Sequence, residues 1–188
     1  MSFTVTVPAS VLPVSIAEAK EHLRVEFADD DNYITALIGA AVDYVERHTR
    51  RALMPQTVLL TRDDFPDVIE PPLPPLQSVA SISYIDTEGS PQTLNPSTYD
   101  IDNVSEPGRI VSSIGNQWPS TSIAINAVSV TFIAGYVDAA SVPPQIKQAI
   151  LLSIGHWYEN REQVVEGKSF SELPMGVEAL LNNYVIWL

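Results

Sequence analysis

The sequence contains no cysteine among its 188 residues. Disulfide bonds, thiolate metal sites and cysteine nucleophiles are therefore excluded, and a reducing cytoplasm is compatible with this composition. Glycine is also scarce, with 8 residues against 15 prolines, which favours stiff connections over flexible ones. No secretory signal peptide is expected, and the most apolar stretch, residues 146–158, is too short and too polar to span a bilayer.

Basic residues are few as well. Ten lysines and arginines stand against 23 aspartates and glutamates, giving a formal net charge of −13. Such a chain repels the phosphate backbone on average, so a general nucleic-acid binder is not expected. Hydrophobic residues make up 45% of the sequence, so the chain should fold, and its length suits one domain or a domain with one insertion.

Helical patterns occupy both ends of the sequence. Ser15 and Glu18 form a capping box, and Asp29–Asp31 is expected to cap a second helix with a long apolar stripe. Proline in a first helical turn marks the start of a third helix. The expected helices cover Ser15 to about Arg24, Asn32 to about Arg50, Pro144 to about Val165 with an end near Gly167, and a stretch after Gly176.

Short strand patterns fill the middle of the sequence. Five prolines between Pro66 and Pro75 indicate an extended connector, and turn signals between the strands predict antiparallel hairpins. The expected strands cover Thr57–Thr61, Val79–Ile85, Gln92–Leu94, Tyr99–Asp102, Arg109–Ile114 and Ala127–Tyr136. The predicted fold class is α+β: one domain over residues 1–188, with a helical core at about 14–54 and 142–188 and an antiparallel β insertion at about 55–140.

Catalytic motifs are missing from the sequence. It contains no nucleophile elbow and no glycine-rich phosphate loop. His22 and His48 stand apart, whereas His156 and Glu159 have a spacing that can share a metal ion. A bridged metal site needs a second such pair, and none exists. We therefore expect no catalytic residues, no cofactor and no metal.

Two groups of residues are candidates for a partner interface. Arg47, Arg50 and Arg51 end the second predicted helix, where they either complement its own dipole or contact an acidic neighbouring subunit. The apolar residues at the end of the sequence either pack on this domain's own core or dock into a neighbouring protein. These residues are Tyr184, Val185, Ile186, Trp187 and Leu188.

An ordered series of short segments resembles the phage head-tail connector family, in the branch with a β insertion. The resemblance covers about Val14 to Tyr184. The segments are His22–Val25, Tyr33–Ile38, Tyr44–Thr49, Arg51–Leu53, Gln56–Thr57, Pro75–Val79, Trp118–Pro119, Ala134–Tyr136, Val142–Lys147 and His156–Glu162.

This resemblance implies a structural role in the neck of a virion, without catalytic residues or cofactors. Members are encoded in phages, prophages and gene transfer agents. They assemble in the host cytoplasm as a ring, usually of twelve subunits, beneath the portal protein, and they extend the DNA channel toward a stopper or tail-completion protein. DNA passes through without specific binding, and neither a membrane nor a small-molecule substrate is implied. In related adaptors the C-terminal segment inserts against the portal, although more basic character is expected near Tyr184 than this sequence has.

Two hypotheses follow. Acidic residues facing the channel would keep DNA from adhering to it, and deletion of Val185–Leu188 would weaken portal attachment without unfolding the domain. The alternatives are another neck protein such as a stopper, a metal-dependent nuclease acting in packaging, and a ligand-binding module on the β insertion. A nuclease requires clustered carboxylates and a basic surface, and the sequence shows neither.

Overall fold

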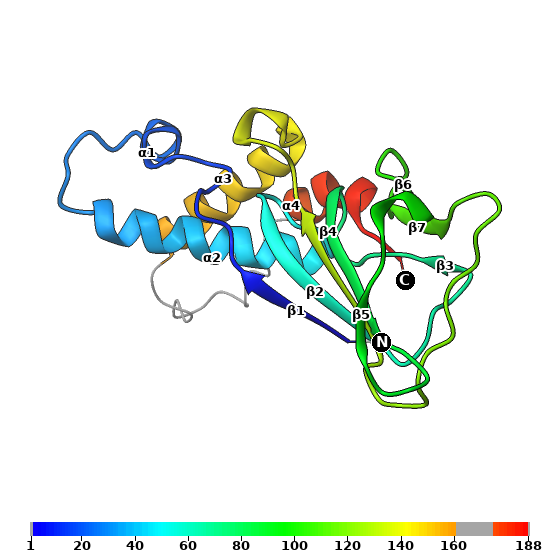
Figure 1. Cartoon of the computed structure of the whole chain (residues 1–188). Helices are drawn as coiled ribbons and strands as arrows, with labels where there is room; N and C mark the ends of the chain where they lie inside the picture. The colour runs from blue at the N-terminus through cyan, green and yellow to red at the C-terminus, as the bar shows by residue number, and fades with distance from the viewer. Residues whose placement is uncertain (1, 161–174, 188) are drawn as a thin grey trace. The chain divides into compact units, whose positions relative to one another are not determined.

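The structure is a computed structural model that describes residues 2–160 and 175–187. The chain divides into two compact units. The β unit consists of Met1–Ser10 and Met54–Val137, and the helical unit consists of Val11–Leu53 and Asp138–Leu188. Figure 1 shows the helices and the antiparallel strands, so the predicted α+β class is confirmed.

The first two helices agree closely with the sequence prediction. Helix α1 (Ile16–Leu23) starts at the predicted capping box, in which Ser15 Oγ accepts the Glu18 N–H and the Glu18 carboxylate accepts the Ser15 N–H. Helix α2 (Asp31–Thr49) buries a stripe of apolar side chains at helical spacing. The buried apolar residues of α2 are Ile34, Ile38, Ala41, Val42 and Val45.

The aspartates lie at the start of α2 as predicted, with Asp30 at the N-cap and Asp31 in the first turn, but the Asp30 side chain makes no capping hydrogen bond. Asp30 instead accepts a hydrogen bond from the Tyr158 hydroxyl, and Asp31 forms a salt bridge of 2.6 Å with Lys20 Nζ. These contacts tie the start of α2 to α3 and α1.

The remaining helices come from the second half of the sequence. Helix α3 (Pro144–Glu159) packs against α2 and against α4 (Met175–Leu181), which leads into a short 3₁₀ turn, η3 (Asn182–Tyr184). Asn160 ends α3 by donating its N–H and side-chain amide to the His156 carbonyl. The predicted continuation to Val165 and Gly167 lies outside the described residues. Within residues 2–160 and 175–187, no helix is long and apolar enough to cross a membrane.

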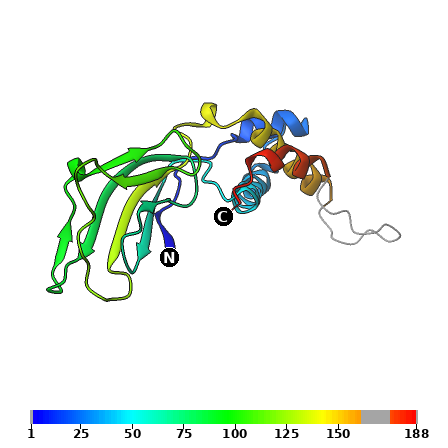
Figure 2. The same cartoon turned by 90° about the vertical axis from the view of Figure 1, so that its right-hand side faces the viewer.

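The β unit contains two antiparallel sheets. The larger has the strand order β1-β2-β8-β4-β5, and the smaller has the order β3-β7-β6. The strands are β1 (Ser2–Val7), β2 (Gln56–Arg62), β3 (Val68–Ile69), β4 (Leu76–Ile85), β5 (Pro91–Thr93), β6 (Tyr99–Asp102), β7 (Arg109–Ser112) and β8 (Val128–Ala134). Strands β2, β8 and β4 lie side by side at the centre of the larger sheet (Figure 2).

Buried and half-buried side chains alternate along the central strands, and the buried ones form the core of the β unit. In β8, Val128, Val130 and Phe132 are buried, while the residues between them are half-buried. Val58 and Leu60 of β2 pair with Phe132 and Val130 and are also fully buried. Burying each of these side chains contributes roughly 1.5–3 kcal/mol to folding. The smaller sheet adds further buried side chains, namely Ile69, Ile110 and Tyr99.

Three strands differ from the sequence prediction. Strand β1 was not predicted, yet it pairs antiparallel with β2 at the edge of the larger sheet, with all six of its residues exposed. The proline-rich connector contains the two-residue strand β3, which lies at a sheet edge, where proline neighbours are tolerated. Strand β7 ends at Ser112 rather than Ile114, because the chain turns at Gly115, whose φ is +84°.

Candidate functional site

The three arginines predicted as one basic group lie at the end of α2 but differ in their exposure to solvent. Arg47 is exposed and forms an i,i+4 salt bridge of 2.9 Å with Asp43. Arg50 is exposed and occupies the left-handed C-cap position with φ of 55°. Arg51 is buried, with 4% of its surface exposed. Only Arg47 and Arg50 therefore present their charge to solvent.

Glu46 fixes the turn that follows α2. Its carbonyl accepts the N–H groups of Arg50 and Arg51, and its carboxylate accepts the Leu53 N–H at 2.7 Å. Burial raises the pKa of the Glu46 carboxyl above its ordinary value, and the charge of Asp43 raises it further, while the Leu53 hydrogen bond acts in the opposite direction. The half-buried carboxylate thus sets the path of the backbone next to Arg51.

We expect Glu46→Gln to stabilise the protein at pH 8 and to have almost no effect on stability near pH 4. The folded state binds a proton on Glu46 more tightly than the unfolded state does. The stabilising contribution of the neutral form is therefore complete below the unfolded pKa and is lost as the pH rises through the folded pKa. Glutamine has no charge to bury, and its amide oxygen still accepts the Leu53 N–H.

Thermal unfolding of both proteins across this pH range measures the effect. As a control, Glu46→Ala also removes the charge but has no acceptor for the Leu53 N–H, so it should be about 1 kcal/mol less stable than Glu46→Gln at both pH values. A Glu46→Gln protein that is less stable than the parent at pH 8 would show that the ionised carboxylate stabilises this turn.

Arg51 holds the last described residues of the chain against α2. We call Tyr184–Trp187 the terminal segment. Arg51 Nε donates to the Tyr184 carbonyl at 2.6 Å, and its guanidinium carbon lies 5.8 Å from the centroid of the Tyr184 ring. The Tyr184 hydroxyl donates to Gln145 Oε1 at 2.9 Å, and the Ile186 N–H donates to the Thr49 carbonyl at 3.1 Å. Side chains and backbone of α2 and α3 together fix the start of the segment.

The terminal segment then turns its tryptophan toward solvent. Val185 and Ile186 are half-buried, whereas Trp187 is 88% exposed. The interpretation that Trp187 packs on the domain's own core is therefore wrong. Leu188 lies outside the described residues. A large exposed aromatic side chain on an anchored backbone is typical of an interface residue.

Within the described part of the chain, the three histidines form no metal site. His48 stacks on Tyr44 with a centroid distance of 5.8 Å, and His22 lies on α1 beside Gly155 of α3. Among the described residues, no group of three or more histidine, aspartate and glutamate side chains is arranged to hold a metal ion. Within residues 2–160 and 175–187, no third metal-ligating side chain therefore joins His156 and Glu159.

A second exposed feature was missed at the sequence level. The loop between β7 and β8 carries three isoleucines, Ile114, Ile123 and Ile125, that are almost wholly exposed. The sequence signal was the presence of Ile123 and Ile125 between the turn at Gly115 and the strand pattern that begins at Ala127. Apolar residues in a predicted loop mark either a buried segment or a contact surface.

The sequence matches the family described as phage gp6-like head-tail connector protein over residues 13–105 and 114–184. No curated protein sequence matches the chain.

Three solved structures share the fold at low sequence identity. A chain of the virion of a native gene transfer agent particle superposes with a TM-score of 0.80 and 21% identity. Chains from the neck of an empty particle, computed with C6 symmetry, and of a native particle, computed with C12 symmetry, give TM-scores of 0.78 and 0.76 with 23% and 22% identity. Each comparison covers 100% of this chain and 97% of the other.

Proposed function

The chain belongs to the phage gp6-like head-tail connector family, and on this premise we propose that it is an adaptor subunit of the virion neck. Copies of the chain form a ring beneath the portal protein, extend the DNA channel and connect the head to a stopper or tail-completion protein. The observation that carries this proposal is the family match, which covers residues of both the helical unit and the β unit.

The similar solved structures support the location and the ring. Two of them are described as necks of gene transfer agent particles, one computed with C6 and one with C12 symmetry. A subunit of the same fold in this chain's particle would occupy an equivalent ring. In that ring the two units act as one adaptor domain, with the helical unit as the ring-forming core and the β unit as an insertion carried by it.

The role is structural rather than enzymatic. The family is a structural connector family. The side chains at the terminal segment bind and orient backbone groups, and their arrangement suits protein contacts.

The terminal segment is the proposed contact with the portal. Trp187 supplies an exposed aromatic anchor, and exposed Arg47 and Arg50 lie on the helix whose end holds the segment. Arg51 acts as a positioning residue, because it binds the Tyr184 carbonyl and is itself buried. The other residues of the proposed contact are Val185, Ile186 and Leu188.

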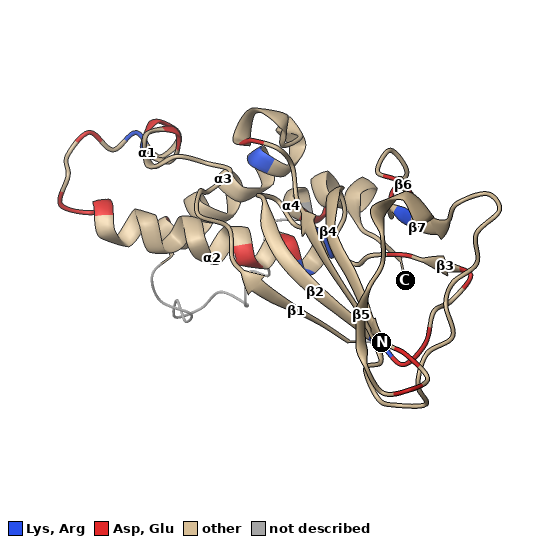
Figure 3. Cartoon of the chain, in the orientation of Figure 1, with Lys and Arg blue, Asp and Glu red and all other residues tan. Residues whose placement is uncertain are grey.

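The acidity of the chain has a role in this proposal. Figure 3 shows acidic residues along both units with few basic residues between them. With a net charge of −13, a ring of such subunits repels the DNA phosphates. We therefore propose that acidic side chains face the channel, so that DNA passes through without adhering. A basic or neutral lumen in the assembled ring would contradict this part of the proposal.

Particles made without this gene test the proposed function. We expect electron microscopy to show heads and separate tails that fail to join, with the DNA either retained or lost from the heads. Supplying the gene on a plasmid should restore joined particles. Normal joined particles in the absence of the gene would remove the adaptor assignment.

A further inference from the structure

The loop between β7 and β8 exposes three isoleucine side chains. We call residues 113–127 the isoleucine loop. In this loop Ile114, Ile123 and Ile125 have relative exposures of 101%, 106% and 84%. Single exposed apolar residues are ordinary on protein surfaces, but a group of them in one loop marks a contact surface.

Hydrogen bonds hold the second half of this loop in a defined position. Thr121 forms a β-bridge with Asp86, and the Ser122 N–H donates to the Ile85 carbonyl at 2.9 Å. On the other side of Ile123 and Ile125, the Asn126 N–H donates to Asp63 Oδ1 at 2.8 Å. The isoleucines are therefore exposed on a backbone that is tied at both ends, which lowers the entropic cost of binding a partner.

Aromatic contacts brace the first half of the loop. The Trp118 ring stacks on Phe65 with a centroid distance of 4.9 Å and an interplanar angle of 5°. Phe65 also meets the Tyr84 ring edge-on at 5.7 Å. These contacts join the loop to the segment that follows β2 and to β4, so the whole surface belongs to the fixed part of the β unit.

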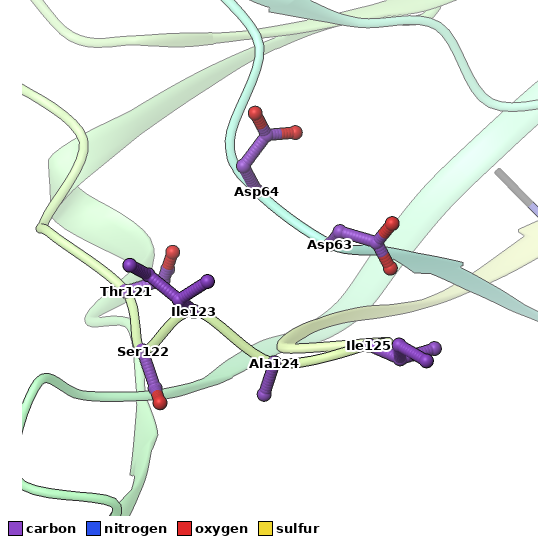
Figure 4. A pocket seen from close by; sticks show the side chains of 7 residues that line it. All are labelled: Asp63, Asp64, Thr121, Ser122, Ile123, Ala124 and Ile125. Carbon is purple, nitrogen blue, oxygen red and sulfur yellow. The ribbon is translucent and has the colours of Figure 1, made fainter.

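An open hollow of about 530 Å³ lies between the isoleucine loop and the end of β2. Figure 4 shows its two sides: Asp63 and Asp64 follow β2 on one side, and Thr121–Ile125 runs along the other. Neither aspartate forms a salt bridge within the part of the chain that the structure describes. The hollow thus combines two carboxylates with two apolar side chains, Ile123 and Ile125.

The charge of the β unit restricts what can bind there. Nine acidic and two basic residues give this unit a formal net charge of −7. A second copy carries the same acidic β unit and would be repelled by it. A cationic segment would instead be attracted to Asp63 and Asp64. Charge complementarity therefore favours a cationic segment of a different protein over the β unit of another copy of this chain.

We propose that this hollow is a docking site for an extended segment of another protein, one that alternates apolar residues with lysine or arginine. The apolar side chains of the segment pack on Ile123 and Ile125, and its cations lie beside Asp63 and Asp64. Each buried methylene group and each partly desolvated ion pair adds a modest gain in binding free energy. The inference depends on the β unit alone and not on the terminal segment or on the position of the chain in a virion.

Nuclear magnetic resonance of the full chain, labelled with ¹⁵N, tests the proposal. The probe is a synthetic peptide of sequence Gly-Ile-Lys-Ile-Lys-Ile-Gly. We expect saturable shift changes at residues 63–64 and 121–126 that weaken as salt is added. Two control peptides, with serine in place of isoleucine and with glutamate in place of lysine, should bind at least about fivefold more weakly.

Two double variants separate the apolar and the charged contributions. Ile123→Ser with Ile125→Ser should weaken the peptide at least about fivefold, without unfolding the protein, because both side chains are exposed. Asp63→Asn with Asp64→Asn should remove most of the salt dependence, and the amide oxygen introduced by the first of these changes can still accept the Asn126 N–H. Ile114→Ser is the matched control: it removes an equally exposed isoleucine that does not line the hollow, and binding should be unchanged.

Three results would overturn the proposal. The first is an absence of saturable shifts at the hollow. The second is an equal response to the serine peptide, with shifts spread over all acidic surfaces, since this indicates unspecific attraction of cations. The third is a shift of the 121–126 signals with protein concentration in the absence of peptide, which would make a second copy of this chain the occupant.

Discussion

Replacing Trp187 with alanine is expected to weaken the attachment of the protein to portal-containing heads by about thirtyfold or more, with the melting temperature unchanged. The indole is 88% exposed in the isolated chain, so its removal costs little folding energy. An exposed tryptophan that becomes buried in an interface typically contributes about 2 kcal/mol or more to binding, which corresponds to about thirtyfold in affinity. Co-sedimentation of the variant with purified portal rings measures the change directly.

The substitution is a cleaner test than deletion of residues 185–188. Deletion also removes the Ile186 N–H that donates to the Thr49 carbonyl, so it disturbs the helical unit as well as the proposed contact. Val104→Ala is the matched control, because Val104 is 90% exposed and lies in the β unit. If Trp187→Ala binds portal rings as tightly as the parent, the terminal segment is not the portal contact.

Replacing Gly135 with alanine is expected to lower the free energy of unfolding by about 3 kcal/mol or more, because two separate costs add together. Gly135 follows β8 with a φ of +112°, a conformation that side-chain-bearing residues rarely adopt. A Cβ atom at this position would also lie 2.2 Å from the Met54 carbonyl oxygen and 2.5 Å from its carbon. Backbone strain is therefore accompanied by overlap with a neighbouring main chain.

Urea unfolding followed by circular dichroism measures this loss of stability, and Gly89→Ala provides the comparison. Gly89 also has a positive φ, of +83°, but a Cβ atom added there would meet no atom within 4 Å. Alanine at Gly89 should cost about 1 kcal/mol, the conformational cost alone. Equal losses in the two variants would mean that the chain relaxes around Met54 and that the close approach at Gly135 is not essential.

The helices were predictable from the sequence because their signals are local. The capping box at Ser15 and the apolar stripe of α2 each depend on residues within one helix, and both were located to within one or two positions. Strand β1 was not predictable in this way. It pairs with β2, about fifty residues further along the chain, and its two faces are both exposed, so neither a nearby turn nor a buried face reveals it.

The candidate interfaces were predictable only in part. The apolar character of the terminal segment was plain from the sequence, but the hydrogen bond from Arg51 to Tyr184 joins residues 133 positions apart. Arg51 was grouped with Arg47 and Arg50 because the three are close in the sequence. In the structure, however, Arg51 is buried and the other two are exposed. The hollow beside Ile123 needs residues from two distant segments, and only their tertiary arrangement brings Asp63 and Asp64 to face the isoleucine loop.

Electron cryomicroscopy of the neck of the assembled particle tests the central proposal most directly. The adaptor assignment predicts a ring of density directly beneath the portal into which the helical unit and the β unit of this chain both fit, with Trp187 in contact with the portal. A neck in which that ring is built from another protein, or in which this chain lies at the tail tip or inside the head, would contradict the assignment.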